Sequence, residues 1–192
     1  MAAFAAVSAV LMAVVVACSG SPSAKPRLQF LGDSITVLSA SQLHERFDDR
    51  FVVDIDAFIG VTTSGMLEQA RVAATAHPKI VVVNLGTNDI GCVRAELSCV
   101  GPYSAQGTEA DLRAMTRAFP SACVIFVDLN THVLYQQRAE ALNRWIHATV
   151  PRVVDWAAAY QPSWFSTPID PHPNEAGRAR LVQLIDHAVS AC

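Results

Sequence analysis

The chain has 192 residues and 52% of them are hydrophobic, so it is long enough to form one domain with a buried core. Its 14 lysines and arginines are opposed by 17 aspartates and glutamates, which gives a net charge of -3. This balance, without a long run of one sign, lacks the basic footprint of a nucleic-acid-binding protein and argues against that class.

An apolar segment opens the sequence. Residues 2–17 are apolar apart from Ser8, and the run is shorter than the roughly 20 residues of a membrane-spanning helix. Its length is typical of the hydrophobic part of a secretory signal peptide. No lysine or arginine precedes the run, unlike in a standard signal peptide, which leaves an uncleaved membrane anchor as an alternative.

The end of this segment predicts how it is processed. The stretch Val15-Val16-Ala17-Cys18 resembles a bacterial lipobox, in which the cysteine is lipidated and becomes the mature N-terminus. Ordinary cleavage near the same place is the alternative. We therefore expect a signal peptide over residues 1–18, a tether over 19–26 and one domain over 27–192. The protein would be exported to the bacterial cell envelope, either lipid-anchored through Cys18 or secreted.

Beyond the tether, apolar runs of strand length alternate with segments whose apolar residues recur at helical spacing. Because a helical segment separates each strand from the next, this alternation predicts a parallel sheet covered by helices on both faces, a three-layer α/β sandwich. In chain order we expect a strand at residues 27–31, a helix at 35–47, a strand at 51–58, a helix at 62–76, a strand at 80–85, a helix at 108–119, a strand at 123–129, a helix at 134–149, a strand at 152–156, a proline-rich loop at 158–173 and a helix at 174–190.

Such sheets bind ligands beyond the carboxyl ends of their strands, so the residues that follow each strand are the candidates for a site. Nucleophilic acyl transfer needs a hydroxyl, a base within hydrogen-bond reach and donors for the oxyanion. Ser34 offers a hydroxyl at a predicted helix N-terminus, and His172 can take its proton and return it to a leaving group. Gly60 can offer a backbone N–H and Asn88 a side-chain amide.

Four short blocks are similar in order to the signatures of a known family. Gly32-Asp33-Ser34-Ile35, Gly60, Gly86-Thr87-Asn88-Asp89 and His172-Pro173 resemble the blocks of the SGNH hydrolases, the GDSL-type esterase and acyl-hydrolase superfamily, and the resemblance spans residues 28–190. It implies a flavodoxin-like α/β/α fold with five parallel strands. It also implies Ser34 as nucleophile, His172 as general base, and an oxyanion hole formed by the N–H groups of Ser34 and Gly60 and the Asn88 side chain.

The acid of the expected triad departs from the family pattern. The family usually has an acid three residues before the histidine, but position 169 is Ile, and the nearest acid, Asp170, is only two residues before His172. Either Asp170 orients the imidazole from this shifted position, or a backbone carbonyl does so and the site is a Ser-His dyad. We favour Asp170 because a charged partner stabilises the imidazolium more effectively.

The cysteines other than Cys18 are even in number, which suits disulfides in an oxidising compartment. In the expected topology, two of them follow the third strand, whereas the other two lie at the opposite edge of the sheet. Bridged Cα atoms lie within about 7 Å of each other, so only one pairing avoids crossing the domain. The expected disulfides are Cys92–Cys99 and Cys123–Cys192, and four unpaired thiols are the alternative.

Other polar residues have simpler interpretations. Asn130 and His132 follow the fourth strand and either line the substrate pocket or cap a loop. Asp33 and Asp89 are expected to hold their turns by accepting backbone N–H bonds, and His147 is expected to be a surface or capping residue. No cluster has zinc-like or calcium-loop spacing, so we expect no metal and no cofactor.

These observations predict a monomeric serine esterase or acyl hydrolase that acts on a small-molecule, glycan or lipid ester. An acyltransferase would use the same residues, and the missing acid at position 169 leaves a non-catalytic glycan-binding module as an alternative. A flavodoxin-like nucleotide binder is disfavoured because no glycine lies between Gly32 and Gly60 to form a phosphate-binding loop.

Overall fold

The computed structural model describes residues 24–91 and 102–192. The expected signal peptide, Cys18, most of the tether and the Cys92–Cys99 pair lie outside the described residues. Within these ranges, no helix is long and apolar enough to cross a membrane.

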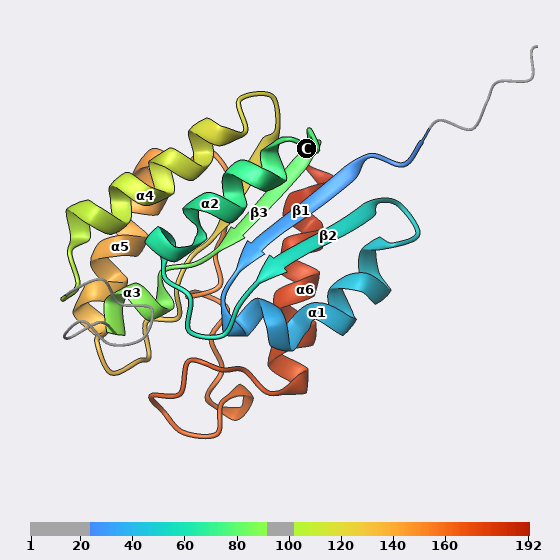
Figure 1. Cartoon of the computed structure of the whole chain (residues 1–192). Coiled ribbons are helices and arrows are strands. Elements are labelled where there is room, and N and C mark those ends of the chain that lie inside the picture. Colours follow the sequence, from blue (N-terminus) through green and yellow to red (C-terminus); the bar gives the residue numbers. More distant parts are fainter. Residues whose placement is uncertain (1–23, 92–101) are drawn as a thin grey trace, which may run out of the picture.

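Five parallel strands form one sheet, in the order β2-β1-β3-β4-β5, which confirms the predicted sheet. The first two strands are joined through a helix, and the later strands are added on the other side of β1 (Figure 1). The strands are β1 (Arg27–Gly32), β2 (Val52–Ala57), β3 (Ile80–Asn84), β4 (Cys123–Val127) and β5 (Val153–Val154).

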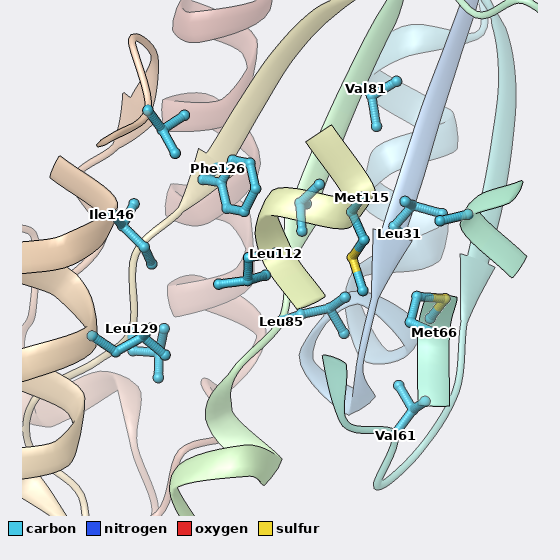
Figure 2. Close-up of a cluster of buried hydrophobic side chains, with 14 of the residues drawn as sticks. Leu31, Val61, Met66, Val81, Leu85, Leu112, Met115, Phe126, Leu129 and Ile146 are labelled. Atoms are coloured by element: carbon cyan, nitrogen blue, oxygen red, sulfur yellow. The ribbon is translucent and has the colours of Figure 1, made fainter. Parts of the chain in front are cut away.

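Helices cover both faces of this sheet, as the alternating pattern predicts. One face packs against α2 (Thr63–Ala74), α4 (Ala105–Ala118) and α5 (Gln136–Thr149), and Figure 2 shows the apolar side chains between these layers. The other face packs against α1 (Ser34–Phe47) and α6 (Glu175–Ser190).

Successive side chains of a strand point to opposite faces, so each central strand contributes to both cores. In β3, Val81 belongs to the core under α2 and α4, whereas its neighbour Val82 belongs to the core under α1 and α6. Every residue of β3 is buried. This explains why residues 80–83 are all aliphatic.

The structure differs from the predicted elements in a few places. A short helix, α3 (Thr87–Gly91), follows β3 where we predicted no helix, and a 3-10 turn, η1 (Pro162–Trp164), lies in the proline-rich loop. The helix expected from residue 108 begins at Ala105, because the Ser104 side chain caps it by accepting the Gly107 N–H.

The fifth strand is shorter than predicted. It has two residues instead of the expected five, because Trp156 donates its N–H to the Val154 carbonyl and turns the chain away from β4. Trp156 is buried and its ring stacks on Trp164 of the following loop.

The predicted Cys123–Cys192 disulfide is present, with Cα atoms 6.0 Å apart. It joins the start of β4 to the chain segment after α6, at the amino edge of the sheet. The loop that precedes α6 lies at the opposite, carboxyl edge (Figure 1).

Removing this disulfide should destabilise the fold. The bond joins residues 69 positions apart, and closing a loop of this size restricts the unfolded chain, so Cys123→Ala/Cys192→Ala should lower the free energy of unfolding by about 2 to 4 kcal/mol. Urea unfolding of both proteins measures this difference. In a reductant the two proteins should unfold alike, and equal unfolding without reductant would contradict the prediction.

Candidate active site

Ser34 begins α1 directly after β1, at the carboxyl edge of the sheet, and is 7% exposed. The turn into the helix requires a glycine at position 32, since a Cβ there would lie 2.0 Å from the Thr36 Oγ1. Thr36 in turn accepts a hydrogen bond from Asn84, the last residue of β3. The first turn of α1 is therefore packed tightly against the ends of two strands, which holds Ser34 in place.

His172 lies 138 residues further along the chain, in the loop before α6, and its Nε2 is 2.8 Å from the Ser34 Oγ. Several bonds hold this loop. Asn174 donates its N–H to the Trp164 carbonyl and caps α6 through its side chain. Gly177 leaves room for close packing, because a Cβ there would lie 2.7 Å from Pro173. The histidine is thus presented by an anchored loop.

Asp170 is the partner of the other ring nitrogen of His172. Its Oδ1 lies 3.0 Å from Nδ1 and also accepts the backbone N–H of His172 at 2.9 Å. A carboxylate that accepts the N–H two residues on forms an Asx turn, and this turn brings the side chain back onto the ring. The spacing of two residues therefore allows the contact, and a carboxylate rather than a backbone carbonyl meets Nδ1.

Ser166 donates its hydroxyl to the second oxygen, Oδ2, of Asp170. Both carboxylate oxygens consequently have donors. Partial burial alone would raise the pKa of Asp170, but the hydrogen bonds from Ser166 and His172 outweigh it and lower the pKa below its ordinary value. Sequence analysis missed Ser166, because a serine in a polar loop gives no distinguishing signal.

Gly60 and Asn88 lie at the same edge, Gly60 in a turn and Asn88 in α3. Gly60 has φ 77°, a left-handed conformation that suits glycine, in the turn between β2 and α2. The Asn88 side-chain amide donates to the carbonyl of Val61, 2.9 Å away. Phe58 of this turn donates its N–H to the Gly32 carbonyl, which joins the turn to the end of β1.

Asp89 corrects one expectation. We expected it to hold its own turn, but its carboxylate accepts both the N–H and the hydroxyl of Thr63, at 3.0 and 2.6 Å. Thr63 begins α2, so Asp89 ties the segment after β3 to the segment after β2. Burial raises the pKa of Asp89 against the effect of these hydrogen bonds.

Asn130 and His132 differ in exposure. Asn130 is buried, and its Oδ1 accepts the His132 N–H at 2.9 Å, so it shapes the turn after β4. The exposed His132 ring stacks on Tyr160 at 3.7 Å between centroids, and Tyr160 stacks on Phe165. Phe165 pairs with Pro173, next to His172. A row of rings therefore leads from the end of β4 to the candidate base, and binding of substrate there stays a prediction.

His147 is exposed, as expected for a surface residue, and it also pairs with the buried Asp128 through Nε2, 2.9 Å from Oδ2. With Asp155 these residues form a cluster of possible metal ligands, the one such cluster found in the described ranges. The other oxygen of Asp128 accepts the Ala157 N–H. The contacts of Asp128 are those of a structural pair between β4 and α5, and we assign no metal to it.

Asp33 precedes Ser34 and is fully buried. As expected, it caps its own helix, with Oδ1 accepting the Ile35 N–H at 2.9 Å. Its Oδ2 is buried without a hydrogen-bond partner among the described residues. Burial raises the pKa of Asp33 to about 7, with a smaller contribution from the negative charge of Asp89.

Comparisons with known proteins agree with this fold. The model of the GDSL-like lipase/acylhydrolase family matches residues 30–180. A GDSL-like lipase from Bacteroides thetaiotaomicron has the same fold, with a TM-score of 0.71 and 20% identity over 86% of this chain and 88% of that one. An acetyl xylan esterase has a TM-score of 0.71 and 15% identity over 85% of this chain and 99% of that one. The lipase/acylhydrolase from Enterococcus faecalis has a TM-score of 0.69 and 18% identity over 86% of this chain and 96% of that one. No curated protein sequence matches the chain.

The raised pKa of Asp33 predicts how stability depends on pH. The fold favours the neutral carboxyl, so its contribution is complete below the unfolded pKa of about 4 and is lost as the pH rises through the folded value of about 7. Asp33→Asn keeps a capping side chain that cannot ionise. Relative to this variant, the wild type should lose stability by at most about 1.4 kcal/mol per pH unit across that window. Urea unfolding at a series of pH values tests this, and a constant difference would contradict it.

Proposed function

The chain belongs to the GDSL-like lipase/acylhydrolase family, and we propose that it is a serine ester hydrolase that works through a covalent acyl-enzyme on Ser34. The observation that carries this proposal is the continuous chain of hydrogen bonds from Ser34 through His172 to Asp170. A hydroxyl, a base and an orienting carboxylate in this order are the groups that acyl transfer from an ester requires.

The first half of the reaction uses both ring nitrogens of His172. When Nδ1 carries the proton that it shares with Asp170, the lone pair of Nε2 faces the Ser34 hydroxyl. As Oγ attacks the ester carbonyl carbon, Nε2 takes the serine proton, and Asp170 stabilises the imidazolium that forms. The imidazolium then gives this proton to the departing alcohol, and the acyl group stays on Ser34.

The second half repeats these steps with water. His172 takes a proton from water, the resulting hydroxide equivalent attacks the acyl carbon, and the proton returns to Oγ as the free acid leaves. The oxyanion of each tetrahedral intermediate would bind to the N–H groups of Ser34 and Gly60 and the amide of Asn88. The position of Ser34 at the N-terminus of α1 supports this assignment, since the helix dipole favours negative charge there.

The proposed substrate class and the proposed location rest on separate observations. The structural likeness to an acetyl xylan esterase makes O-acyl carbohydrates the first substrates to test, with lipid esters as the second class. The apolar run at residues 2–17 and the motif that ends at Cys18 support export with a lipid anchor.

The absence of an acid at position 169 was the reason to consider a non-catalytic module. The contact between Asp170 and His172 removes this reason.

Replacing the proposed nucleophile should abolish activity. Wild type should react with a fluorophosphonate probe and hydrolyse p-nitrophenyl acetate, whereas Ser34→Ala should lose both, with kcat reduced by at least about 1000-fold. Ser41→Ala is the matched control, because Ser41 is an exposed serine of the same helix. If Ser34→Ala is labelled as strongly as the wild type, the esterase assignment is wrong. Longer p-nitrophenyl esters and acetylated xylan then define the substrate.

Asp170 should contribute more to catalysis than Ser166, which orients its carboxylate. Asp170→Asn should lower kcat/KM for p-nitrophenyl acetate by about 100-fold or more, because the imidazolium loses its charged partner. Ser166→Ala removes one hydrogen bond to that carboxylate and should cost about tenfold. Ser166→Thr keeps the hydroxyl and should restore activity, which a purely structural role of Ser166 would not require. A loss below about threefold in Asp170→Asn would instead indicate a Ser-His dyad.

A further inference from the structure

Two adjacent grooves lie at the amino edge of the sheet, at the opposite end of the strands from Ser34. The first, of about 380 Å³, lies between the C-terminal parts of α4 and α5 and the start of β4. The second, of about 430 Å³, lies between the end of α2 and the end of α4. The grooves share Phe119, Pro120 and Ala122, so they form one continuous surface.

Among residues 24–91 and 102–192, the ionisable side chains that line these grooves are all basic, and no aspartate or glutamate lines either of them. This is a local departure from a chain whose net charge is -3. We refer to these side chains as the amino-edge surface: His77, Lys79, Arg113, Arg117 and Arg152.

Local structure accounts for only part of this charge. Arg117 lies in the last turn of α4, where a cation complements the helix dipole, and Arg113 has Glu109 4.0 Å away. Lys79 and Arg152 instead precede strands and are exposed. Within the described ranges, no carboxylate lies within 4.0 Å of Lys79, Arg117 or Arg152. Their charges are available to a partner.

The N-terminal segment enters the domain at this same edge. The carbonyl of Arg27, the first residue of β1, accepts the Lys79 N–H, and the Lys79 carbonyl accepts the N–H of Cys123. Eight residues lie between Cys18 and Arg27, so the nine steps from one Cα to the other can span at most about 32 Å. A chain held in a bilayer through its apolar segment or through Cys18 would therefore keep the amino-edge surface near the lipid headgroups.

We propose that the amino-edge surface docks on an anionic phospholipid bilayer, so that the active edge faces away from the membrane. The proposal goes beyond esterase activity and rests on the proposed membrane anchoring. Each basic residue near an anionic leaflet increases binding by about fivefold. β1 has six residues, so the sheet places Ser34 about 20 Å further from the bilayer than Arg27. The accessible substrates are then esters in solution or on the cell wall, and not lipids of the bilayer to which the protein is attached.

Vesicle binding tests the docking surface. All proteins carry Cys18→Ser, so that every one retains the same apolar segment without an acyl chain. Binding is measured by co-sedimentation with vesicles of phosphatidylcholine alone and of phosphatidylcholine mixed with phosphatidylglycerol. The parent should prefer the anionic vesicles, and Arg117→Glu/Arg152→Glu should reduce this preference by about tenfold or more. Raising the sodium chloride concentration should also remove it.

A matched control separates position from net charge. Arg144→Glu/Arg180→Glu makes the same change in net charge at exposed arginines of α5 and α6 that line neither groove, and should largely keep the preference. If the groove variant does not fold, Arg117→Gln/Arg152→Gln replaces it. An unchanged preference in the groove variant, or an equal loss in the control, overturns the proposal. Stronger displacement by inorganic phosphate than by chloride at equal ionic strength would also overturn it, by indicating a discrete anion site.

The orientation of the bound protein on the bilayer is tested by a separate measurement. Hydrolysis of p-nitrophenyl acetate should proceed at the same kcat/KM with and without anionic vesicles, because the Ser34 edge stays in water. A fall in kcat/KM on binding would show that this edge meets the bilayer and would contradict the proposed orientation. The binding measurements do not depend on turnover, so they stand even if the ester is not hydrolysed.

Discussion

All five strands of the sheet run in the same direction, so each strand delivers the segment that follows it to one common edge. Backbone bonds join these segments to one another: Asp33 donates its N–H to the Asn84 carbonyl, and Phe58 donates to the Gly32 carbonyl. Groups as far apart in sequence as Ser34 and His172 meet at this edge. The position of every candidate catalytic group depends on this shared direction.

Two aspartates near the site show how local contacts set the charge around it. Asp170 has donors on both oxygens, which lowers its pKa and keeps a negative charge behind His172, where it would stabilise an imidazolium in the proposed reaction. Asp33 is buried, one of its oxygens has no hydrogen-bond partner in the part of the chain that the structure describes, and its pKa rises to about 7. A neutral Asp33 adds no negative charge beside the oxyanion that would form next to Ser34.

The two edges of the sheet have different properties. The carboxyl edge is held by hydrogen bonds between the segments that follow the strands, such as those from Thr63 to Asp89 and from Asn88 to Val61. The amino edge is fixed by the Cys123–Cys192 disulfide and has basic grooves beside the start of β1. Because a rigid sheet separates them, the molecule can be attached at one edge while an ester is bound at the other.

The sequence by itself determined the class of the fold and pointed to the principal residues of the candidate site. Alternation of strand and helix periods is local and strong, so it predicted the parallel sheet. The position of Ser34 after the first strand and of His172 in the loop after the fifth strand predicted that these two residues share an edge. The pairing of Cys123 with Cys192 followed from that topology. Tertiary structure decided whether Asp170 reaches His172, because this depends on an Asx turn and on the hydroxyl of Ser166. It also brought the Asp89 carboxylate to Thr63 of α2 and gathered basic residues of separate elements at the amino edge. Such contacts join segments that have no periodic relation in the sequence.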